Sequence, residues 1–178
     1  MFLGAYWSAR QESESEAVGR VSSFLTWLVR FEPELATWYG LGKSRKDALR
    51  RPLLAFDSAS VLPRMRRNRS DVDHSVIEAL GWSLSLWNGR DVSFSCCVGL
   101  YSPRLGNCVL VNFGSRAKYP TQEQQKAIVE AMIELFDPDH AVATSHKVLD
   151  AAGAKRPWEA GSLIYERGGE VKSFAVEL

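Results

Sequence analysis

Alternation between apolar and small polar side chains dominates residues 82–113 and restricts the folds that this chain can adopt. Residues 82–87 and 92–98 each place an apolar side chain at every second position. A period of two is typical of a half-buried strand, because successive side chains point to opposite faces of a sheet. Between the two runs, Asn88-Gly89 tolerates positive φ and predicts a hairpin. We therefore expect an antiparallel meander whose apolar face needs a helical cover.

Two capping boxes mark where such helices begin. In Ser13-x-x-Glu16 and Thr121-x-x-Gln124, the first and last side chains each accept a hydrogen bond from a backbone N–H that the helix leaves unpaired. Apolar residues follow both boxes at helical spacing: Val18, Val21, Leu25 and Leu28, then Ala127, Ile128, Ala131, Met132 and Leu135. This spacing predicts two amphipathic helices, one over residues 14–31 and one that stops at Asp137.

The remaining predicted elements are short. Strands are expected at residues 2–7, 109–113 and 141–145 and in a hairpin of 163–165 with 171–176, and helical segments at 35–39, 44–51, 58–67 and 147–152. The chain has 178 residues and shows no repeat or interdomain linker, so residues 1–178 are expected to form a single domain. The predicted fold class is α+β, a mainly antiparallel sheet with helices packed against it.

Composition argues against several kinds of site. Cys96, Cys97 and Cys108 are odd in number and lack CxxC spacing, and the histidines are scattered, so neither a disulfide framework nor a metal site is expected. Alternation sends Cys96 and Cys97 to opposite faces. No apolar run approaches the roughly 20 residues of a membrane span, and the first residues lack a signal-peptide pattern. A cytoplasmic protein is expected.

Catalytic motifs are not evident either. Gly42-Lys43-Ser44 resembles the end of a phosphate-binding loop, but Thr37 stands where the pattern needs its first glycine. The serines lack a GxSxG elbow, and no nucleophile and base can be paired from the sequence. We therefore expect no catalytic residue, no bound cofactor and no enzymatic activity.

Charge is unevenly distributed along the chain. Residues 43–69 contain nine basic and two acidic residues, whereas the net charge of the whole chain is +1. Such a segment could bind nucleic acid, because Lys and Arg neutralise phosphates. No aromatic residues are spaced through it for base stacking, so a solvated basic face is favoured over a nucleic-acid-binding module at 43–69.

Several short motifs carry a resemblance to a known family. They are Gly4-Ala-Tyr-Trp7, Arg10-Gln-Glu12, Pro33, Trp38, Leu80-Gly81 and Ser85-Leu-Trp-Asn-Gly89. In this order the chain resembles the immunity protein 52 family of bacterial polymorphic toxin systems, which include type VI secretion effectors. The resemblance implies an α+β protein that binds a cognate nuclease toxin of the restriction-endonuclease type and blocks it by occlusion. Immunity by DNA mimicry would need an acidic surface, which the near-neutral charge does not favour.

A partner-binding site is expected around the predicted hairpin and the loop before it. Trp27 and Trp82 are expected in the core, but Trp87 falls on the serine face of its strand and could anchor a partner. Trp87, Arg90 and Asp91 at the turn, together with Asp71 and Asp73 in the polar loop, are the predicted contact residues. The oligomeric state is left open.

Overall fold

One antiparallel sheet forms the centre of the structure, a computed structural model that describes residues 1–31 and 35–175. Within these residues its ten strands are β1 (Phe2–Trp7), β2 (Trp38–Gly40), β3 (Pro52–Leu53), β4 (Arg66–Arg67), β5 (Trp82–Trp87), β6 (Val92–Val98), β7 (Asn107–Phe113), β8 (His140–Thr144), β9 (Leu163–Glu166) and β10 (Lys172–Ser173). They lie in the order β10-β9-β8-β1-β7-β6-β5-β2-β3, and β4 pairs separately with β5. The expected antiparallel sheet is confirmed.

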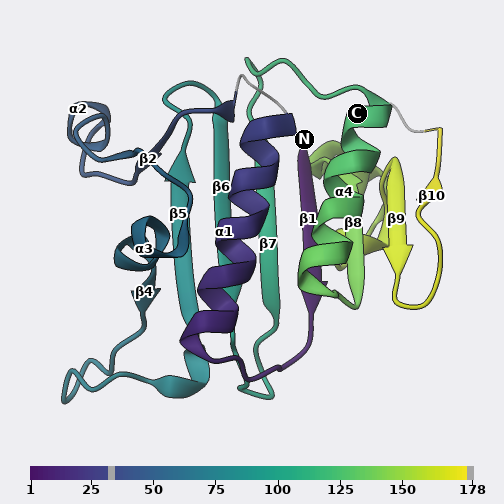
Figure 1. The fold of residues 1–178 in the computed structure, drawn as a ribbon. Helices are drawn as coiled ribbons and strands as arrows, with labels where there is room; N and C mark the ends of the chain where they lie inside the picture. Colours follow the sequence, from purple (N-terminus) through teal and green to yellow (C-terminus); the bar gives the residue numbers. More distant parts are fainter. Residues whose placement is uncertain (32–34, 176–178) are drawn as a thin grey trace.

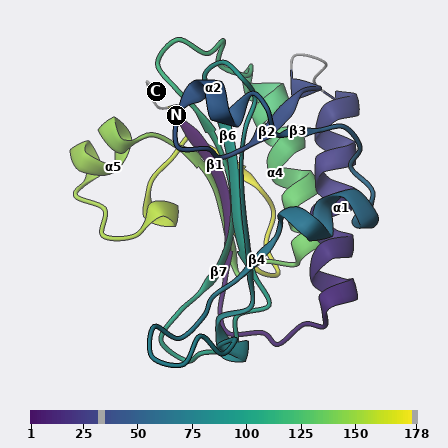
Figure 2. The same cartoon turned by 90° about the vertical axis from the view of Figure 1, so that its left-hand side faces the viewer.

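Helices cover the two faces of this sheet unequally. They are α1 (Glu14–Phe31), α2 (Arg45–Ala48), α3 (Ser58–Val61), α4 (Gln122–Phe136) and α5 (His146–Ala152), with 3₁₀ turns η2 (Leu62–Arg64), η3 (Glu78–Leu80) and η4 (Pro157–Glu159). The two long helices, α1 and α4, lie side by side on one face (Figure 1). The short α5 lies on the other face (Figure 2). This arrangement confirms the α+β class.

The core lies between the sheet and the pair α1 and α4. The central strands β5, β6 and β7 bury every second side chain, as their alternating sequence predicts. Phe94 of β6 is fully buried, and its ring centroid lies 6.0 Å from that of Phe24 in α1 and 6.4 Å from that of Trp38 in β2. Phe136 of α4 meets Phe24 edge-on at 5.7 Å. Both long helices therefore pack on the sheet through one aromatic cluster.

Both predicted capping boxes form. Ser13 and Glu16 exchange backbone-to-side-chain hydrogen bonds at the start of α1, and Thr121 and Gln124 do so at the start of α4. Asp137 ends α4 in the left-handed conformation. The structure confirms that α1 covers 14–31 and that α4 stops at Asp137. Both ends could be predicted because a helix cap depends only on residues within a few positions of it.

Short edge strands account for the wrong predictions. Residues 38–40 form β2 where a helical turn was expected, because Tyr39 and Gly40 pair with the far end of β5. The helical segment at 58–67 is correct only as far as Arg64, after which Arg66–Arg67 pair with β5 as β4. Part of the expected turn at 35–39 and the end of the expected strand at 171–176 fall outside the described residues.

Two further expectations need adjustment. Trp27 is only partly buried, stacked between Phe24 and Phe31 on α1, although a core position was expected. The hairpin between β5 and β6 forms, but among its residues only Gly89 has a positive φ, of 81°. Asn88 instead accepts hydrogen bonds from the backbone N–H groups of Arg90 and Val92 through its side chain. The turn is therefore a four-residue connection held by Asn88.

Replacing Phe94 by alanine tests the role of the aromatic cluster. Phe94→Ala should lower the free energy of unfolding by about 3–5 kcal/mol, because it removes a fully buried ring that both Phe24 and Trp38 contact. Urea denaturation measures this change. Ser95→Ala, at the next position but on the opposite face, is the control and should change it by less than about 0.5 kcal/mol.

Candidate partner-binding surface

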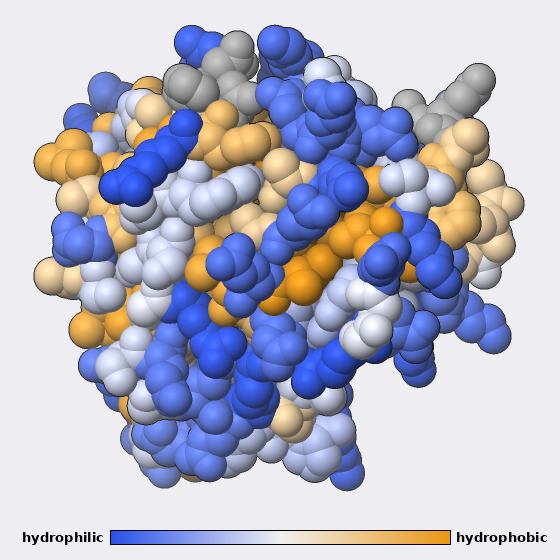
Figure 3. Space-filling model, turned by 45° about the vertical axis from the view of Figure 1, so that its right-hand side comes forward, coloured by the Kyte–Doolittle hydropathy of each residue, from blue (hydrophilic) through white to orange (hydrophobic). Residues whose placement is uncertain are grey.

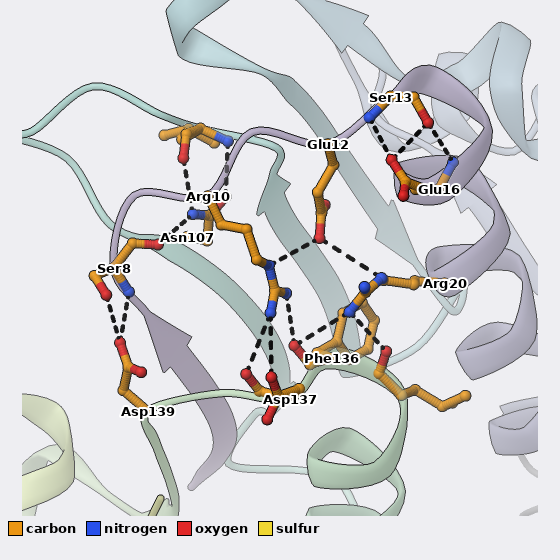
Figure 4. Close-up of polar contacts among 12 residues, drawn as sticks. Ser8, Arg10, Glu12, Ser13, Glu16, Arg20, Asn107, Phe136, Asp137 and Asp139 are labelled. Atoms are coloured by element: carbon orange, nitrogen blue, oxygen red, sulfur yellow. Dashed lines mark hydrogen bonds and ion pairs between the residues drawn. The ribbon is translucent and has the colours of Figure 1, made fainter.

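A cluster of charged residues joins the start of α1 to the end of α4 (Figure 4). Arg10 donates to the carbonyl oxygen of Phe136 at 2.6 Å and to Glu12 at 3.1 Å. Arg20 of α1 lies 3.6 Å from the same Glu12 carboxylate. The Glu12 side chain is only 3% exposed, so it balances both guanidinium groups inside the protein. The two arginines place positive charge at the C-terminus of α4, where the helix dipole is negative.

A second set of polar contacts fixes the same end of the molecule. The buried Asn107 accepts from the backbone N–H of Leu100 and donates to the carbonyl oxygen of Ser8. Asp139 accepts hydrogen bonds from the backbone and hydroxyl of Ser8 and pairs with Arg167 at 3.1 Å. Burial raises the pKa of Asp139, but these contacts outweigh it and hold the pKa below the usual value for an aspartate. These residues hold this end of the fold together.

The hairpin between β5 and β6 brings three of the predicted contact residues together. Trp87 is half-buried, and its indole Nε1–H donates to the carbonyl oxygen of Arg90 at 2.8 Å. The carboxylate of Asp91 accepts from the backbone N–H of Arg116 at 2.6 Å, and its carbonyl accepts from Gly114. The hairpin is therefore rigid and tied to the loop after β7.

Two hollows flank this hairpin. One of about 260 Å³ is lined by Arg90, Asp91 and the basic residues Arg116 and Lys118. The other, of about 320 Å³, lies toward α5 and is lined by Trp87, Asp91 and residues that include His146. Asp91 contributes to both hollows, so a partner that docks on the hairpin would find recesses on either side of it.

Residues 68–77 form an ordered loop that carries the other two predicted contact residues. Its stem is closed by a bridge between Arg69 and Val76 and by a hydrogen bond of 2.8 Å from the Arg69 guanidinium to the carbonyl oxygen of His74. Hydrogen bonds from Ser70 and Ser75 stabilise the charged carboxylate of Asp73 and hold its pKa below the usual value. Asp71 and Asp73 are exposed on either side of Val72, whose side chain is 93% exposed.

These two groups of predicted residues lie at opposite ends of β5. Figure 1 shows the loop after β4 at the lower end of the sheet and the turn between β5 and β6 at its upper end. The six residues of β5 span about 17 Å. The structure thus gathers Trp87, Arg90 and Asp91 and places Asp71 and Asp73 separately.

Between the two groups lies a part of the sheet that the described helices leave largely open (Figure 2), although Arg45 of α2 lies over the Trp87 ring at 5.8 Å. We call this part the open face, and it consists of Ser83, Ser85, Trp87, Ser93, Ser95, Cys97, Cys108, Leu110 and Asn112 of β5, β6 and β7. These side chains are half-buried or exposed. Trp158 of η4 covers β1 and β8 instead, with its ring 5.0 Å from Tyr6 and 4.8 Å from His140. The sequence indicated a polar face through its alternating serines, but it did not indicate that this face stays largely open.

Many cations of the basic segment 43–69 have structural partners. Arg51 pairs with Asp47 at 3.1 Å, and Arg64 donates to the carbonyl oxygen of Pro52 at 2.9 Å. Arg67 pairs with Glu78 and stacks over Trp82 at 4.3 Å. A hollow of about 430 Å³ remains beside β5, with Arg51, Arg64 and Arg66 in its lining; we call it the basic hollow. The segment is thus largely a structural edge of the sheet.

The side of the molecule around α4 and β9, away from the basic segment, has a partly apolar surface. In Figure 3 a strip of apolar residues runs between charged ones. Beside α4, a hollow of about 520 Å³ is lined by Ile133, Tyr165 and Val171 and bordered by charged residues such as Glu134. Scattered apolar surface of this kind is normal where a core reaches the solvent.

Neither a metal site nor a membrane-spanning helix is present among the described residues. Within 1–31 and 35–175, no group of three or more His, Cys, Asp or Glu side chains could hold a metal ion. In the same part of the chain, no helix is long and apolar enough to cross a membrane.

Neutralising Glu12 tests the charged cluster. Glu12→Gln keeps the size of the side chain but leaves Arg10 and Arg20 without their shared carboxylate, so we expect a loss of about 2 kcal/mol in the free energy of unfolding. Chemical denaturation measures it. The control is Glu14→Gln, an exposed position two residues away, which should change stability by less than about 0.5 kcal/mol.

Comparison with known proteins identifies the family. The family model described as Immunity protein 52 matches residues 1–166 of the 178 residues. A search of proteins with curated functions finds no match. The match covers β1 to β9 and so includes the charged cluster, the loop 68–77 and the hairpin. The chain therefore belongs to the immunity protein 52 family, as the motifs from Gly4 to Gly89 indicated.

Proposed function

We propose that this protein protects a bacterial cell by binding and occluding a nuclease toxin encoded beside it. The observation that carries the proposal is the family match over residues 1–166, because an immunity protein has a toxin as its partner. The nuclease as target is supported by the family resemblance seen in the sequence motifs. Protection of DNA would take place in the cytoplasm and would need contact alone, without catalysis by this chain.

The surface that we propose for the toxin joins the loop 68–77, the open face and the hairpin. A standard interface covers about 800 Å² on each partner, a patch roughly 30 Å across. The loop and the hairpin adjoin opposite ends of β5, a strand about 17 Å long, and the open face lies between them (Figure 1), so we propose one continuous surface along this strand. Trp87 would supply an aromatic anchor at one end, since tryptophan is enriched among the residues that dominate binding energy.

Electrostatics support the acidic loop as the part that meets a nuclease. A nuclease binds the phosphates of DNA and therefore presents basic side chains in its cleft. Asp71 and Asp73 are exposed, and hydrogen bonds to the Asp73 carboxylate lower its pKa and stabilise its charged form. Complementary charges of this kind speed encounter and exclude wrong partners. An acidic patch confined to the tip of this loop does not require the whole protein to be acidic, so it is compatible with the net charge of +1.

Rigidity supports the same surface. The loop is closed by the Arg69 contact to His74, and the hairpin by the Trp87 and Asp91 hydrogen bonds. Groups that are already ordered in the free protein lose little conformational entropy on binding, so more of the contact energy appears as affinity.

Nucleic-acid binding through residues 43–69 is the second candidate function, and the basic hollow is the observation that favours it. Its three arginines could hold a phosphate. Two of them, however, already bind Asp47 and the carbonyl oxygen of Pro52, and both Arg51 and Arg66 are exposed to solvent. This candidate is separable by experiment, because phosphate contacts make binding strongly dependent on salt.

Mixing the protein with the nuclease domain of the toxin encoded beside it tests the first candidate. We expect DNA cleavage to stop at a near one-to-one ratio, because a stoichiometric complex covers the cleft. A gel assay of plasmid cleavage and size-exclusion chromatography of the mixture measure inhibition and binding. If the neighbouring toxin binds but has another activity, the immunity role stands and the proposal of a nuclease target is wrong. If the neighbouring toxin does not bind, both the immunity role and the nuclease target are wrong. Salt-sensitive binding of the isolated protein to DNA would support the second candidate.

Charge reversal tests the acidic loop. Asp71→Lys combined with Asp73→Lys should weaken toxin binding by roughly tenfold or more, mainly through slower association, because attraction becomes repulsion. Surface plasmon resonance at low and high salt measures both rates. The matched control is Glu130→Lys combined with Glu134→Lys, which makes the same change of charge on the exposed side of α4 and should leave affinity unchanged. Equal effects of the two pairs would rule out a specific role of the loop.

Arg90 and Trp87 provide the corresponding test at the hairpin. Trp87→Ala should weaken toxin binding by about 2 kcal/mol if the indole is an anchor, and Arg90→Ala should have a smaller effect because its side chain is exposed. Isothermal titration calorimetry measures both. An unchanged affinity for Trp87→Ala, with its thermal stability intact, would remove the hairpin from the interface.

A further inference from the structure

Two cysteines face each other across neighbouring strands on the open face. Cys97 of β6 and Cys108 of β7 are directly opposite in the register of the sheet, and both are free thiols and half-buried. Opposite residues of antiparallel strands have Cα atoms about 4.5–5.5 Å apart, which lies inside the range of roughly 4.4–6.8 Å that disulfides span. The backbone therefore already holds the two sulfur atoms within reach of a covalent bond.

Cys96 provides a contrast in the adjacent position. Its side chain points to the core face, where it is buried. Burial raises its pKa, so it remains a neutral thiol at physiological pH. The chain thus contains one inert thiol in the core and a reactive pair on the outside of the same sheet.

The neighbours of the pair leave it accessible and provide positive charge. Across the sheet, one row of opposite residues runs from Arg66 through Ser83 and Cys97 to Cys108 and Tyr6. Ser83 is small, so it does not shield Cys97. Arg66 is exposed two strands away from Cys97, or about 10 Å, and it lines the basic hollow together with Ser83. A small anionic molecule can therefore be attracted to the side of the pair.

The two thiols also differ in reactivity. A hydrogen bond from the Cys108 thiol lowers the pKa of Cys97 to about 7, and the same contact raises the pKa of Cys108. The thiolate is the nucleophilic form, so the lowered pKa favours Cys97 as the attacking thiol. Cys97 is placed to attack first, and Cys108 to resolve the product.

We propose that Cys97 and Cys108 form a dithiol modification site that reacts with small anionic disulfides, of which glutathione disulfide is the type, and closes to an internal cross-strand disulfide. This inference does not depend on the proposed toxin partner. It adds a redox reaction to the open face, which we also propose as part of the toxin-binding surface.

The reaction consists of two exchanges. The Cys97 thiolate attacks one sulfur of the small disulfide, the S–S bond of that molecule breaks, and the departing thiolate takes a proton from solvent. Cys108 then releases its proton to solvent and attacks the Cys97 sulfur, which expels the second small thiolate. Overall the protein loses two electrons and two protons, and the small disulfide is reduced to two thiols.

Oxidation of the whole chain followed by mass spectrometry tests the proposal. The reduced protein is incubated with glutathione disulfide at pH 7 under native conditions, quenched with acid, and analysed intact and after proteolysis without reduction. The expected product is lighter by two hydrogen atoms, carries no glutathione and contains a peptide linked through Cys97 and Cys108. Dithiothreitol should restore the original mass.

Single variants separate the two roles. Cys108→Ser should stop at a stable glutathione adduct on Cys97, because the resolving thiol is absent. Cys97→Ser should form an adduct at least about tenfold more slowly, since burial raises the pKa of the remaining Cys108 thiol. Cys96→Ala is the matched control and should form the same disulfide as the natural sequence. Circular dichroism shows whether each variant is folded. If a variant does not fold, the peptide map of the unsubstituted chain still shows which two cysteines are linked. A native chain that stays reduced, or one that links Cys96, would overturn the proposal.

Discussion

Burial of one face of the sheet against α1 and α4 is the interaction on which the other features of this structure depend. The alternating sequence of β5, β6 and β7 sends Leu84, Phe94 and Val109 to the helices, and Phe24 and Phe136 fill the space between the layers. Burial of an apolar side chain of this size contributes about 1.5–3 kcal/mol. Because the period is two, every residue committed to this core places its neighbour on the opposite side, and the open face follows directly from the packed one.

Only part of that opposite side is covered, and the reason lies in the lengths of the elements. The seven residues of α5 and the turn η4 follow β8, so they pack mainly on β8 and β1, and a hollow separates His146 of α5 from Trp87 and Ser93. The central strands nevertheless need no further cover, because their outward side chains are mainly serines and cysteines, which tolerate solvent. A sheet of this design can present polar surface to a partner without exposing its core.

Local signals allowed much of this fold to be predicted, and non-local ones account for the failures. The caps at Ser13 and Thr121 and the alternation through 82–98 set the bounds of α1, α4, β5 and β6, because each depends on residues a few positions apart. The strands β2 and β4 were missed because two or three residues become a strand only through pairing with a distant β5. For the same reason, the sequence allowed each contact residue to be proposed but not its position relative to the others. The distance between Asp71 and Trp87, for example, depends on how the strands pair. The pairing of Cys97 with Cys108 was equally invisible, since it requires the register of β6 against β7.

The residues that carry the family resemblance mostly build this scaffold. Gly4 lies where any larger side chain would meet Leu110, whose Cδ2 atom would be 2.7 Å from an added Cβ, and Trp7 is buried against Phe136. Arg10 and Glu12 fasten the end of α4. A motif of this kind identifies the fold and, through it, the family, whereas recognition of one particular toxin needs side chains that the fold does not use. The tip of the loop 68–77 meets that condition, because Asp71 and Val72 extend into solvent and can change without disturbing the sheet. In our proposal, the charged cluster and the aromatic core therefore keep the shape constant, and the loop, the hairpin and the open face select the partner.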